Sequence, residues 1–338
     1  MSAIDRSLTK KEENAIISAA EKAVKDVDNA RKSIASVIFG QEDVVERSLI
    51  TLLSGGHGLL VGLPGLAKTK LVETLGIVLG LSEQRIQFTP DLMPSDILGS
   101  EILRTDSDGS RSFQFVKGPV FTQLLMADEI NRASPRTQAA LLQSMQEYHV
   151  TIAGKRHDLP APFHVLATQN PLEQEGTYPL PEAQLDRFLM QIDVLYPSIE
   201  AERKILFETT GASEDKAKKV MTSKQLQEMQ ALVRRIPVGE SVVAAILELV
   251  RSSRPGGIED EYDELIEWGP GPRASQALML TSRARALLHG RLAPSVDDVL
   301  ALAEPVLQHR MQVSFAARAR ENKVTVRDII SDRKGRIG

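Results

Sequence analysis

The stretch from Leu59 to Lys70, LLVGLPGLAKTK, constrains the fold of this chain more than any other segment. An apolar run suited to a buried strand ends at a glycine-bearing loop, and a Lys-Thr pair then begins a helical pattern. This is the layout of a P-loop, in which backbone N–H groups and a helix N-terminus hold phosphates. The general pattern G-x-x-x-x-G-K-[ST] has glycine where this chain has Ala67. The alternative is a glycine-rich turn between a core strand and a core helix.

Each part of a P-loop has a chemical role. The lysine, Lys68, would reach the terminal phosphates of a nucleotide, and the hydroxyl of Thr69 would bind Mg²⁺. The backbone of the loop would hold the remaining phosphate oxygens. The sequence therefore predicts a nucleotide-binding set made of Gly62, Leu63, Pro64, Gly65, Leu66, Ala67, Lys68, Thr69 and Lys70.

Composition narrows the class of protein. The 338 residues suggest about two domains, and a hydrophobic content of 42% is ordinary for a globular protein with a real core. The net charge of −4 argues against a dedicated nucleic-acid binder, which would carry a basic surplus. The absence of cysteine excludes disulfides and thiolate metal sites, and it fits a reducing cytoplasm, which is the expected location.

No targeting or membrane segment is expected. The first residues are charged and lack the apolar centre of a signal peptide. Residues 48–67 carry no Asp, Glu, Lys or Arg, and their number is close to the roughly 20 residues that span a bilayer. Because this stretch contains the glycines of 55–58 and Pro64, it reads as a helix end, a turn and a buried strand.

The hydrophobic pattern predicts an α/β domain followed by helices. Expected strands lie at 59–61, 85–89, 123–127, 163–168 and 188–192, and expected helices at 10–38, 42–54, 68–79 and 134–146. Strands that alternate with helices indicate a parallel sheet covered on both faces. Two hairpins are expected as well, one turning at 105–110 and one formed by 148–152 and 156–159.

From about Pro197 the pattern is purely helical. Helices are expected at 198–210, 223–236, 240–253, 273–289 and 295–310, with Ser223 and Ser295 as N-caps. The predicted organisation is therefore a nucleotide-binding α/β domain over 1–196 and an all-helical domain over 197–338.

Polar residues follow several of the predicted strands. In open α/β sheets ligands bind beyond the carboxyl ends of the strands. Four features are expected there: the P-loop, the pair Asp128 and Glu129, Asn170, and the segment before Phe188. Asp128 could hold Mg²⁺ and Glu129 could polarise an attacking water, or both could face the dipole of the next helix. The Asn170 amide could hold that water, or it could form a turn before a proline.

Two arginines are candidates for contact with phosphate. Arg187 lies between a helix and a buried strand, where it could reach the nucleotide of a neighbouring subunit as an arginine finger. The alternative is an ion pair with Asp186 or Glu182. Arg273 opens a predicted helix, where the macrodipole disfavours a cation, and this mismatch suggests an anionic partner.

Together these residues resemble those of an AAA+ ATPase, and more narrowly the MoxR family, over about residues 37–330. MoxR proteins commonly have alanine at the position of Ala67. Gly40 and Gln41 lie in a segment that resembles the adenine-side box. The other matching segments are 55–69 for Walker A, 88–99 for the loop into the helix-2 insert, 127–133 for Walker B, 148–159 for the pre-sensor-1 hairpin, 167–171 for sensor 1, 180–188 for the arginine finger and 271–275 for sensor 2.

The resemblance implies an architecture and a chemistry. It implies a P-loop AAA+ core with a five-stranded parallel sheet and helices on both faces, followed by an all-helical lid. It also implies rings, commonly hexamers, with ATP and Mg²⁺ between subunits. One subunit would supply catalytic Lys68, Glu129, Asn170 and Arg273, with Thr69 and Asp128 on the metal, and its neighbour would supply Arg187.

The biological role that the resemblance implies is chaperone-like remodelling, maturation, or metal or cofactor insertion of a partner protein. A protein with a von Willebrand factor A domain is a possible co-factor. Alternatives are a metal-chelatase motor subunit, a scaffold without turnover and a nucleic-acid motor. Against the last, Asp106 and Asp108 match Arg104 and Arg111, and no aromatic–basic interleaving is present, so no nucleic acid is expected. The acidic stretch 259–264 is either a docking surface or a solvated loop.

Overall fold

The computed structural model describes residues 10–105, 107, 110–173, 176–210, 216–258, 260–319 and 323–337. At its centre lies a five-stranded sheet in the order β2-β5-β8-β1-β9, and every neighbouring pair is parallel. Its strands are β1 (Gly58–Gly62), β2 (Glu83–Gln87), β5 (Leu124–Asp128), β8 (His164–Gln169) and β9 (Met190–Val194). The predicted parallel sheet with five strands is confirmed.

Two strands are offset by two residues from the prediction: β9 (Met190–Val194) lies later than the expected 188–192, and β2 lies earlier than expected. β2 begins at Glu83 and ends at Gln87, two residues earlier than the expected 85–89. It pairs with β5 from Glu83 opposite Leu124 to Gln87 opposite Asp128, so the partner strand sets its limits.

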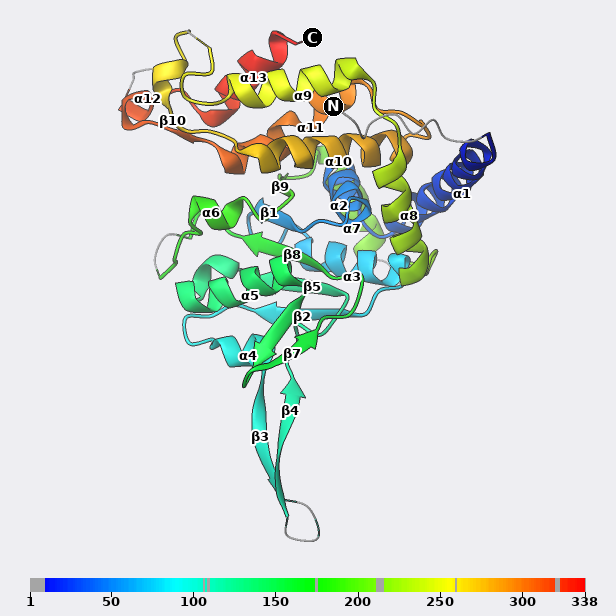
Figure 1. Ribbon diagram of the computed structural model, residues 1–338, viewed down its shortest axis with the longest axis vertical. Helices are drawn as coiled ribbons and strands as arrows, with labels where there is room; N and C mark the ends of the chain where they lie inside the picture. Colours follow the sequence, from blue (N-terminus) through cyan, green and yellow to red (C-terminus); the bar gives the residue numbers. More distant parts are fainter. Residues whose placement is uncertain are drawn as a thin grey trace.

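Helices cover both faces of the sheet (Figure 1). The helices and 3₁₀ turns of this half are α1 (Lys10–Ala35), α2 (Glu42–Leu53), α3 (Lys68–Leu79), α4 (Pro94–Leu98), η1 (Ile130–Arg132), α5 (Pro135–Glu147) and α6 (Glu182–Leu185). Side chains of a strand alternate between faces, so Leu60 and Leu166 pack in the cluster with α1, α2 and α3. Leu59 and Val165 pack in the other cluster, with α5.

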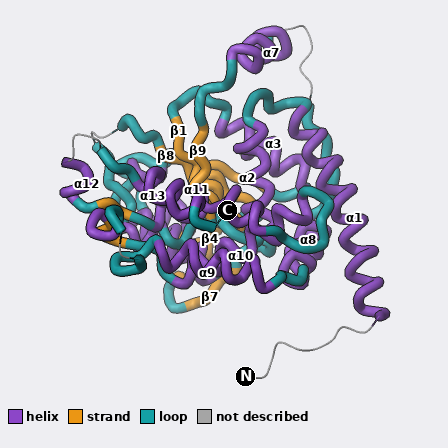
Figure 2. Tube along the Cα trace, turned by 90° about the horizontal axis from the view of Figure 1, so that it is seen from above, coloured by secondary structure: helices purple, strands orange, loops and turns teal. Residues whose placement is uncertain are grey.

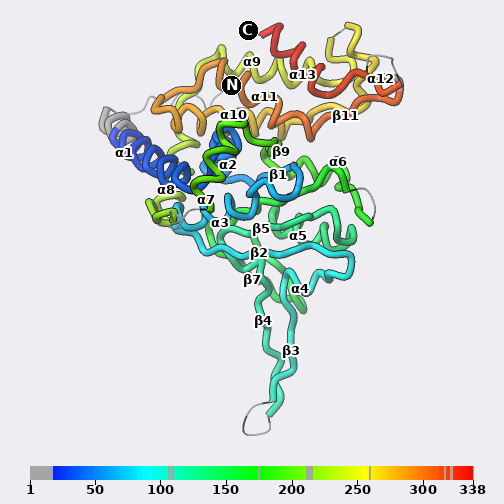
Figure 3. Tube along the Cα trace, turned by 180° about the vertical axis from the view of Figure 1, so that it is seen from behind, coloured from blue at the N-terminus to red at the C-terminus, as the bar shows by residue number. Residues whose placement is uncertain are grey.

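Two hairpins extend from the α/β half. β3 (Gly99–Thr105) and β4 (Arg111–Lys117) form a long arm that projects away from the body (Figures 1 and 3). β6 (His149–Ile152) and β7 (Lys155–Asp158) form the second predicted hairpin. The two meet where the Phe115 ring stacks on His157, with 4.0 Å between ring centroids. Asp106, Asp108 and Gly109 of the predicted turn at 105–110 lie outside the described residues.

The C-terminal half is mainly helical, as predicted. Its elements are α7 (Ile199–Thr209), α8 (Ser223–Arg235), α9 (Glu240–Ser252), η2 (Asp263–Leu265), β10 (Ile266–Trp268), α10 (Pro272–Leu288), α11 (Val296–Leu307), η3 (Gln308–Arg310), β11 (Gln312–Val313), α12 (Phe315–Ala319) and α13 (Val326–Gly335). Helix α7 stands apart from the other helices when the molecule is seen from above (Figure 2).

Two expectations for this half are wrong. It is not all-helical, because β10 pairs antiparallel with β11, and these strands are too short to produce a periodic sequence pattern. Ser223 is the first residue of α8 rather than its N-cap. Thr222 is the cap, and its hydroxyl accepts a hydrogen bond from the backbone N–H of Gln225. Ser295 caps α11 as predicted.

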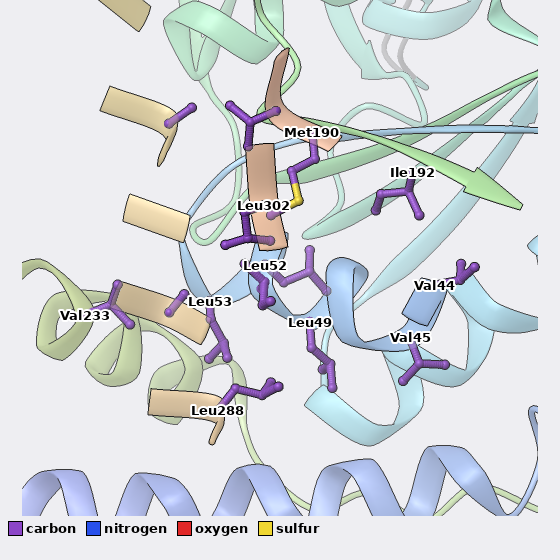
Figure 4. Packing of buried hydrophobic residues seen from close by; sticks show 14 of the residues in the cluster. Val44, Val45, Leu49, Leu52, Leu53, Met190, Ile192, Val233, Leu288 and Leu302 are labelled. Atoms are coloured by element: carbon purple, nitrogen blue, oxygen red, sulfur yellow. The ribbon is translucent and has the colours of Figure 1, made fainter. Parts of the chain in front are cut away.

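Helix α2 joins the two halves through a shared core (Figure 4). Its buried side chains contact β9 on one side and the C-terminal helices on the other. The labelled members of this cluster are Val44, Val45, Leu49, Leu52 and Leu53 from α2, Met190 and Ile192 from β9, and Val233, Leu288 and Leu302 from α8, α10 and α11. The boundary at 196/197 remains a prediction, and apolar packing is continuous across it.

Within the part of the chain that the structure describes, none of the helices combines the length and the apolar character needed to cross a bilayer.

Candidate functional site at the carboxyl edge of the sheet

The loop after β1 has the geometry of a P-loop. Gly65 and Ala67 have φ of 82° and 57°, and α3 begins directly afterwards at Lys68. Left-handed backbone costs a non-glycine residue about 1–2 kcal/mol, which explains the glycine in the general pattern. Ala67 adopts this conformation all the same. Gly62 is needed for a different reason, since a Cβ there would lie 2.5 Å from the carbonyl oxygen of Val194.

Lys68 folds back over the loop. Its Nζ donates hydrogen bonds to the carbonyl oxygens of Gly62, at 2.7 Å, and Leu63, at 2.6 Å. Burial lowers the pKa of the Lys68 ammonium, while the nearby carboxylates of Asp128 and Glu129 oppose this fall. A cation that is partly desolvated and held by loop carbonyls suits a phosphate ligand.

A cavity of about 500 Å³ opens between the loop and the carboxyl ends of β2, β5 and β8. Its lining consists of Pro64, Gly65, Leu66, Ala67, Lys68, Thr69, Lys70, Arg85, Gln87, Asp128, Glu129, Thr168 and Asn170. Three of the four polar features expected at this edge therefore meet in one cavity: the loop, the Asp128–Glu129 pair and Asn170.

Asp128 is held by two neighbouring strands. One carboxylate oxygen accepts from the Thr168 hydroxyl at 2.5 Å, and the other accepts from Arg85 Nη2 at 2.6 Å. The same Thr168 oxygen accepts the backbone N–H of Glu129 at 2.8 Å. Thr168 thus links the two carboxylate residues and fixes the backbone between them.

Glu129 occupies a strained position. Its φ is +56°, and strained backbone at a non-glycine residue is common at functional sites. Its carboxylate accepts from Gln87 Nε2 at 2.6 Å and lies 3.2 Å from Arg132 Nε. Both carboxylates are therefore held by side chains of β2, β8 and η1. Neither of them caps the next helix, because the N-cap of α5 is Ser134.

Asn170 forms the predicted turn and also lines the cavity, while its role toward water remains a prediction. Its side-chain oxygen accepts the backbone N–H of Leu172 at 3.2 Å, which is a turn of the kind expected before a proline. The residue is also buried and lines the cavity.

Three residues of this cavity escaped the sequence analysis: Arg85, Gln87 and Thr168. The available signal was positional. Thr168 is the last residue of a predicted strand, where parallel strands bring polar side chains together. Arg85 and Gln87 stand at the start and in the middle of the strand predicted at 85–89, so only the observed end of β2 at Gln87 places them at this edge.

The segment before Phe188 lies at the opposite edge, which corrects the fourth expectation. It precedes β9, and the strands are parallel, so it lies at their amino ends. Here a cavity of about 280 Å³ is lined by Arg187, Arg273 and Arg310, together with residues that precede β1. The five residues of β1 separate the two edges by roughly 16 Å.

Asp186 organises these arginines. It lies 3.3 Å from Arg273 Nη1 and 2.8 Å from Arg310 Nε. Arg187 forms no ion pair with any described residue, so the alternative of a pair with Asp186 or Glu182 is not observed. The structure does not bring Arg273 to the P-loop cavity either, and its half-exposed side chain lies beside Arg187 instead.

Gly40 and Gln41 lie near the P-loop edge but line no part of its cavity. Gln41 Nε2 donates to the carbonyl oxygen of Leu195, just beyond β9, at 3.0 Å. Gly40, with φ of +67°, packs against Ala201 of α7. It lines a separate cavity of about 760 Å³.

The acidic stretch near residue 260 is partly neutralised. Asp260 forms ion pairs with Arg333 and Arg336 of the C-terminal segment. Glu259 lies outside the described residues. Asp260 therefore belongs to an internal contact rather than to a free surface.

Comparison with known proteins defines the class. Residues 57–190 match the model of the ATPase family associated with various cellular activities (AAA), and residues 259–333 match an AAA lid domain. The fold and the P-loop cavity are therefore those of an AAA ATPase with its lid.

The relatives are more specific. Chaperone MoxR1 of Mycobacterium tuberculosis is 42% identical over 301 residues, covering 88% of this chain and 78% of that protein. Protein MoxR of Paracoccus denitrificans is 31% identical over 310 residues, covering 86% and 90%. The chain belongs to the MoxR family of AAA+ ATPases. The solved structure of a candidate ATPase from Cytophaga hutchinsonii superimposes with a TM-score of 0.87 at 36% identity, covering 95% of this chain and 97% of that one.

Proposed function

We propose that this protein hydrolyses ATP with Mg²⁺ at the carboxyl edge of its sheet. The observation that carries the proposal is the single cavity shared by the P-loop lysine and the two strand-end carboxylates. Lys68 binds the terminal phosphates, Glu129 polarises the attacking water and Asn170 holds that water. Gln87 and Arg132 fix the direction of the Glu129 carboxylate.

The residues present fit a nucleotide-bound Mg²⁺. The Thr69 hydroxyl and the Asp128 carboxylate line the same cavity. Among the described residues, no group of three or more His, Asp or Glu side chains could hold a metal by itself. Mg²⁺ is usually bound by one or two carboxylates with substrate phosphates, so Thr69 and Asp128 match that mode. When bound, it would neutralise charge on the phosphates.

We infer that a second copy of the chain completes the site. Arg187 and Arg273 lie at the amino edge, across the sheet from the P-loop of their own chain. A ring of copies, for which we propose six, would place this edge against the nucleotide of the next copy. Arg187 would then be the arginine finger, and Arg273 would act on the neighbour's nucleotide too, rather than on its own as the resemblance first implied. Gly40 and Gln41 would flank the base.

The biological role that we propose is chaperone-like remodelling or maturation of a partner protein, including metal or cofactor insertion. A relative that is named as a chaperone supports it. A co-factor protein with a von Willebrand factor A domain and a cytoplasmic location remain predictions, as does the absence of a nucleic-acid partner.

Two substitutions test the ATPase proposal. Glu129→Gln should bind ATP without turning it over, because the amide cannot polarise the water, and Lys68→Ala should bind no nucleotide. ATP binding by a fluorescent analogue and phosphate release by the concentrated protein measure both. The matched control is Glu228→Gln, at an exposed position on α8. Hydrolysis by Glu129→Gln at the parent rate would show that Glu129 is not the catalytic carboxylate.

A further inference from the structure

The turn η3 consists of Gln308, His309 and Arg310. It forms hydrogen bonds with β9 and with the segment just before that strand. Gln308 Nε2 donates to the carbonyl oxygen of Gln191 at 3.2 Å and to Asp193 Oδ2 at 2.9 Å. His309 Nε2 lies 3.0 Å from the Phe188 carbonyl oxygen. His309 and Arg310 thus hold the segment that carries Arg187, and Gln308 holds the strand that follows it.

Arg310 makes the most contacts in this turn. The residue is 2% exposed, and its donors reach Asp186, Phe188 and Leu189 on both sides of Arg187. Nε donates to Asp186 Oδ1 at 2.8 Å, Nη2 to the Phe188 carbonyl at 2.6 Å, and Nη1 to the Leu189 carbonyl at 3.2 Å. These bonds fix the backbone on both sides of Arg187.

Asp186 extends this network to Arg273. Its other carboxylate oxygen accepts from Arg273 Nη1 at 3.3 Å. Arg273 belongs to α10 and Arg310 follows α11, so a single carboxylate connects both elements to the segment of Arg187. Phe188 anchors that segment further, because its ring is fully buried in the cluster with α5.

The chemistry of this position calls for arginine. A buried cation is costly unless its donors are satisfied, and here each nitrogen has a partner. The planar guanidinium presents five donors in a fixed fork, whereas a lysine ammonium is a point donor with no fixed fork. Lysine could keep the charge near Asp186, but it could not hold the carboxylate and the two carbonyls together.

We propose that Arg310 is a positioning residue for catalysis. It holds Arg187 and Arg273 as one pair and ties that pair to the C-terminal helices. A shift of those helices would then carry both arginines together toward or away from the nucleotide of the neighbouring copy. This inference rests on the proposed function, in which that pair completes a neighbour's site.

The test uses mixed assemblies of the full chain. Lys68→Ala lacks a working P-loop but keeps its arginines, and Arg187→Ala keeps its P-loop. Each variant alone should be inactive, and the mixture should recover ATP hydrolysis at sites that combine the two. Arg310→Lys is then added either to the Lys68→Ala chain or to the Arg187→Ala chain.

A positioning role predicts an asymmetric result. Arg310→Lys in the Lys68→Ala chain should lower the recovered kcat by roughly 10–100-fold with little change in KM, because misplacing a catalytic group by about 1 Å costs that much. In the Arg187→Ala chain, which has no finger to position, the same substitution should leave the recovered rate unchanged. A purely structural defect would lower the rate from either chain.

Two further variants keep the outcome decisive. Arg333 is the matched control, since it is also a fully buried arginine, bonded to Asp260 and to the Ser252 carbonyl, and it lies away from the arginine pair. Arg333→Lys should show no asymmetry. If Arg310→Lys does not fold, Asp186→Asn replaces it with the same expectation. Equal losses in both chains, or none in either, would overturn the positioning role. No recovery in the first mixture would overturn the shared site itself, and the positioning role with it.

Discussion

The two edges of the central sheet differ in how they are built. The carboxyl edge consists of one loop and the ends of neighbouring strands, with a lysine among carboxylates. The amino edge is assembled from segments far apart in the chain, near residues 57, 187, 273 and 310, and carries arginines around one aspartate. The first edge gathers the P-loop and the strand-end carboxylates in one cavity, whereas the second presents cations that lie across the sheet from the P-loop of their own chain. This difference supports the proposal that a second copy of the chain completes the active site.

The amino edge also contains buried neutral histidines. His57 precedes β1, where its Nδ1 accepts the Val165 N–H at 2.9 Å and its Nε2 lies 3.1 Å from the Met145 carbonyl. Burial lowers its pKa to about 3, the nearby His164 adds to the fall, and the bond to Met145 opposes it. Burial lowers the pKa of His164 to about 4. Protonation of these buried histidines would therefore destabilise the fold at this edge.

The largest expected effect tests whether the carboxyl edge can work alone. Arg187→Ala should lower kcat for ATP hydrolysis by about 10³-fold or more, the usual contribution of an arginine finger, while ATP binding changes far less. Steady-state kinetics and nucleotide titration separate the two. Arg235→Ala, at an exposed position on α8, is the control. A parent-like kcat for Arg187→Ala would mean that the amino edge takes no part in the chemistry.

A smaller effect on kcat is expected from removing the Thr168 hydroxyl, which connects Asp128 to Glu129. Thr168→Val removes the hydroxyl that bonds Asp128 and the Glu129 N–H, which should cost about 1–3 kcal/mol of unfolding free energy. It should also lower kcat, whereas Thr168→Ser should keep most of both. Denaturant unfolding and ATPase assays measure this. Thr281→Val, which removes a buried hydroxyl bonded to the Ala277 carbonyl, should spare kcat. Equal kcat losses in the two valine variants would rule out a specific role for Thr168.

The histidines predict a pH dependence of stability at the amino edge. Unfolded histidines take up protons below their ordinary pKa of 6.5, whereas folded His57 and His164 stay neutral down to about 3 and about 4. The unfolding free energy should therefore fall as the pH drops through 6.5 toward 4, by about 1.4 kcal/mol per pH unit for each histidine.

Substitution of one histidine sharpens this prediction. His164→Gln should make the acidic slope shallower by about 1.4 kcal/mol per pH unit, as measured by urea unfolding at several pH values. Above the ordinary histidine pKa, the stability of both proteins should depend equally on pH. An unchanged acidic slope would show that His164 is not the group that resists protonation.

The smallest expected effect concerns the backbone of the P-loop alone. Ala67→Gly removes a left-handed alanine, which costs about 1–2 kcal/mol, but makes the unfolded chain more flexible by about 0.4–1 kcal/mol. The net gain in unfolding free energy should be about 1 kcal/mol or less. Ala153→Gly, at φ of +48° in the second hairpin, is the matched comparison. A loss of stability at Ala67 alone would indicate that its methyl group makes a favourable contact.

Much of the carboxyl edge could be predicted because its information is local. The lysine and threonine of the P-loop stand directly after an apolar strand, and Asp128 and Glu129 end another. Their spacing along the chain fixes their place at a strand end. Arg85, Gln87 and Thr168 could not be assigned partners in this way, because their contacts depend on β2 and β8 flanking β5 in the sheet.

The amino edge could not be predicted from local pattern. Arg187 and Arg273 lie far apart in the chain, with β9, α7, α8 and α9 among the elements between them, and only the packing of α10 and η3 against the segment before β9 brings them into one cavity. The pairing of β10 with β11 escaped for a similar reason, since strands of three and two residues carry no periodic signal.

The sequence by itself determined the P-loop, the five apolar strands and the acidic pair, because hydrophobic periodicity and adjacent polar residues specify local structure. The tertiary structure alone decided which residues from distant segments meet at the amino edge. In a parallel sheet, a residue before a strand and a residue after it lie a full strand length apart. That rule places Arg187, which precedes β9, at the opposite edge from the phosphate loop, and the packing of α10 brings Arg273 into the same cavity as Arg187.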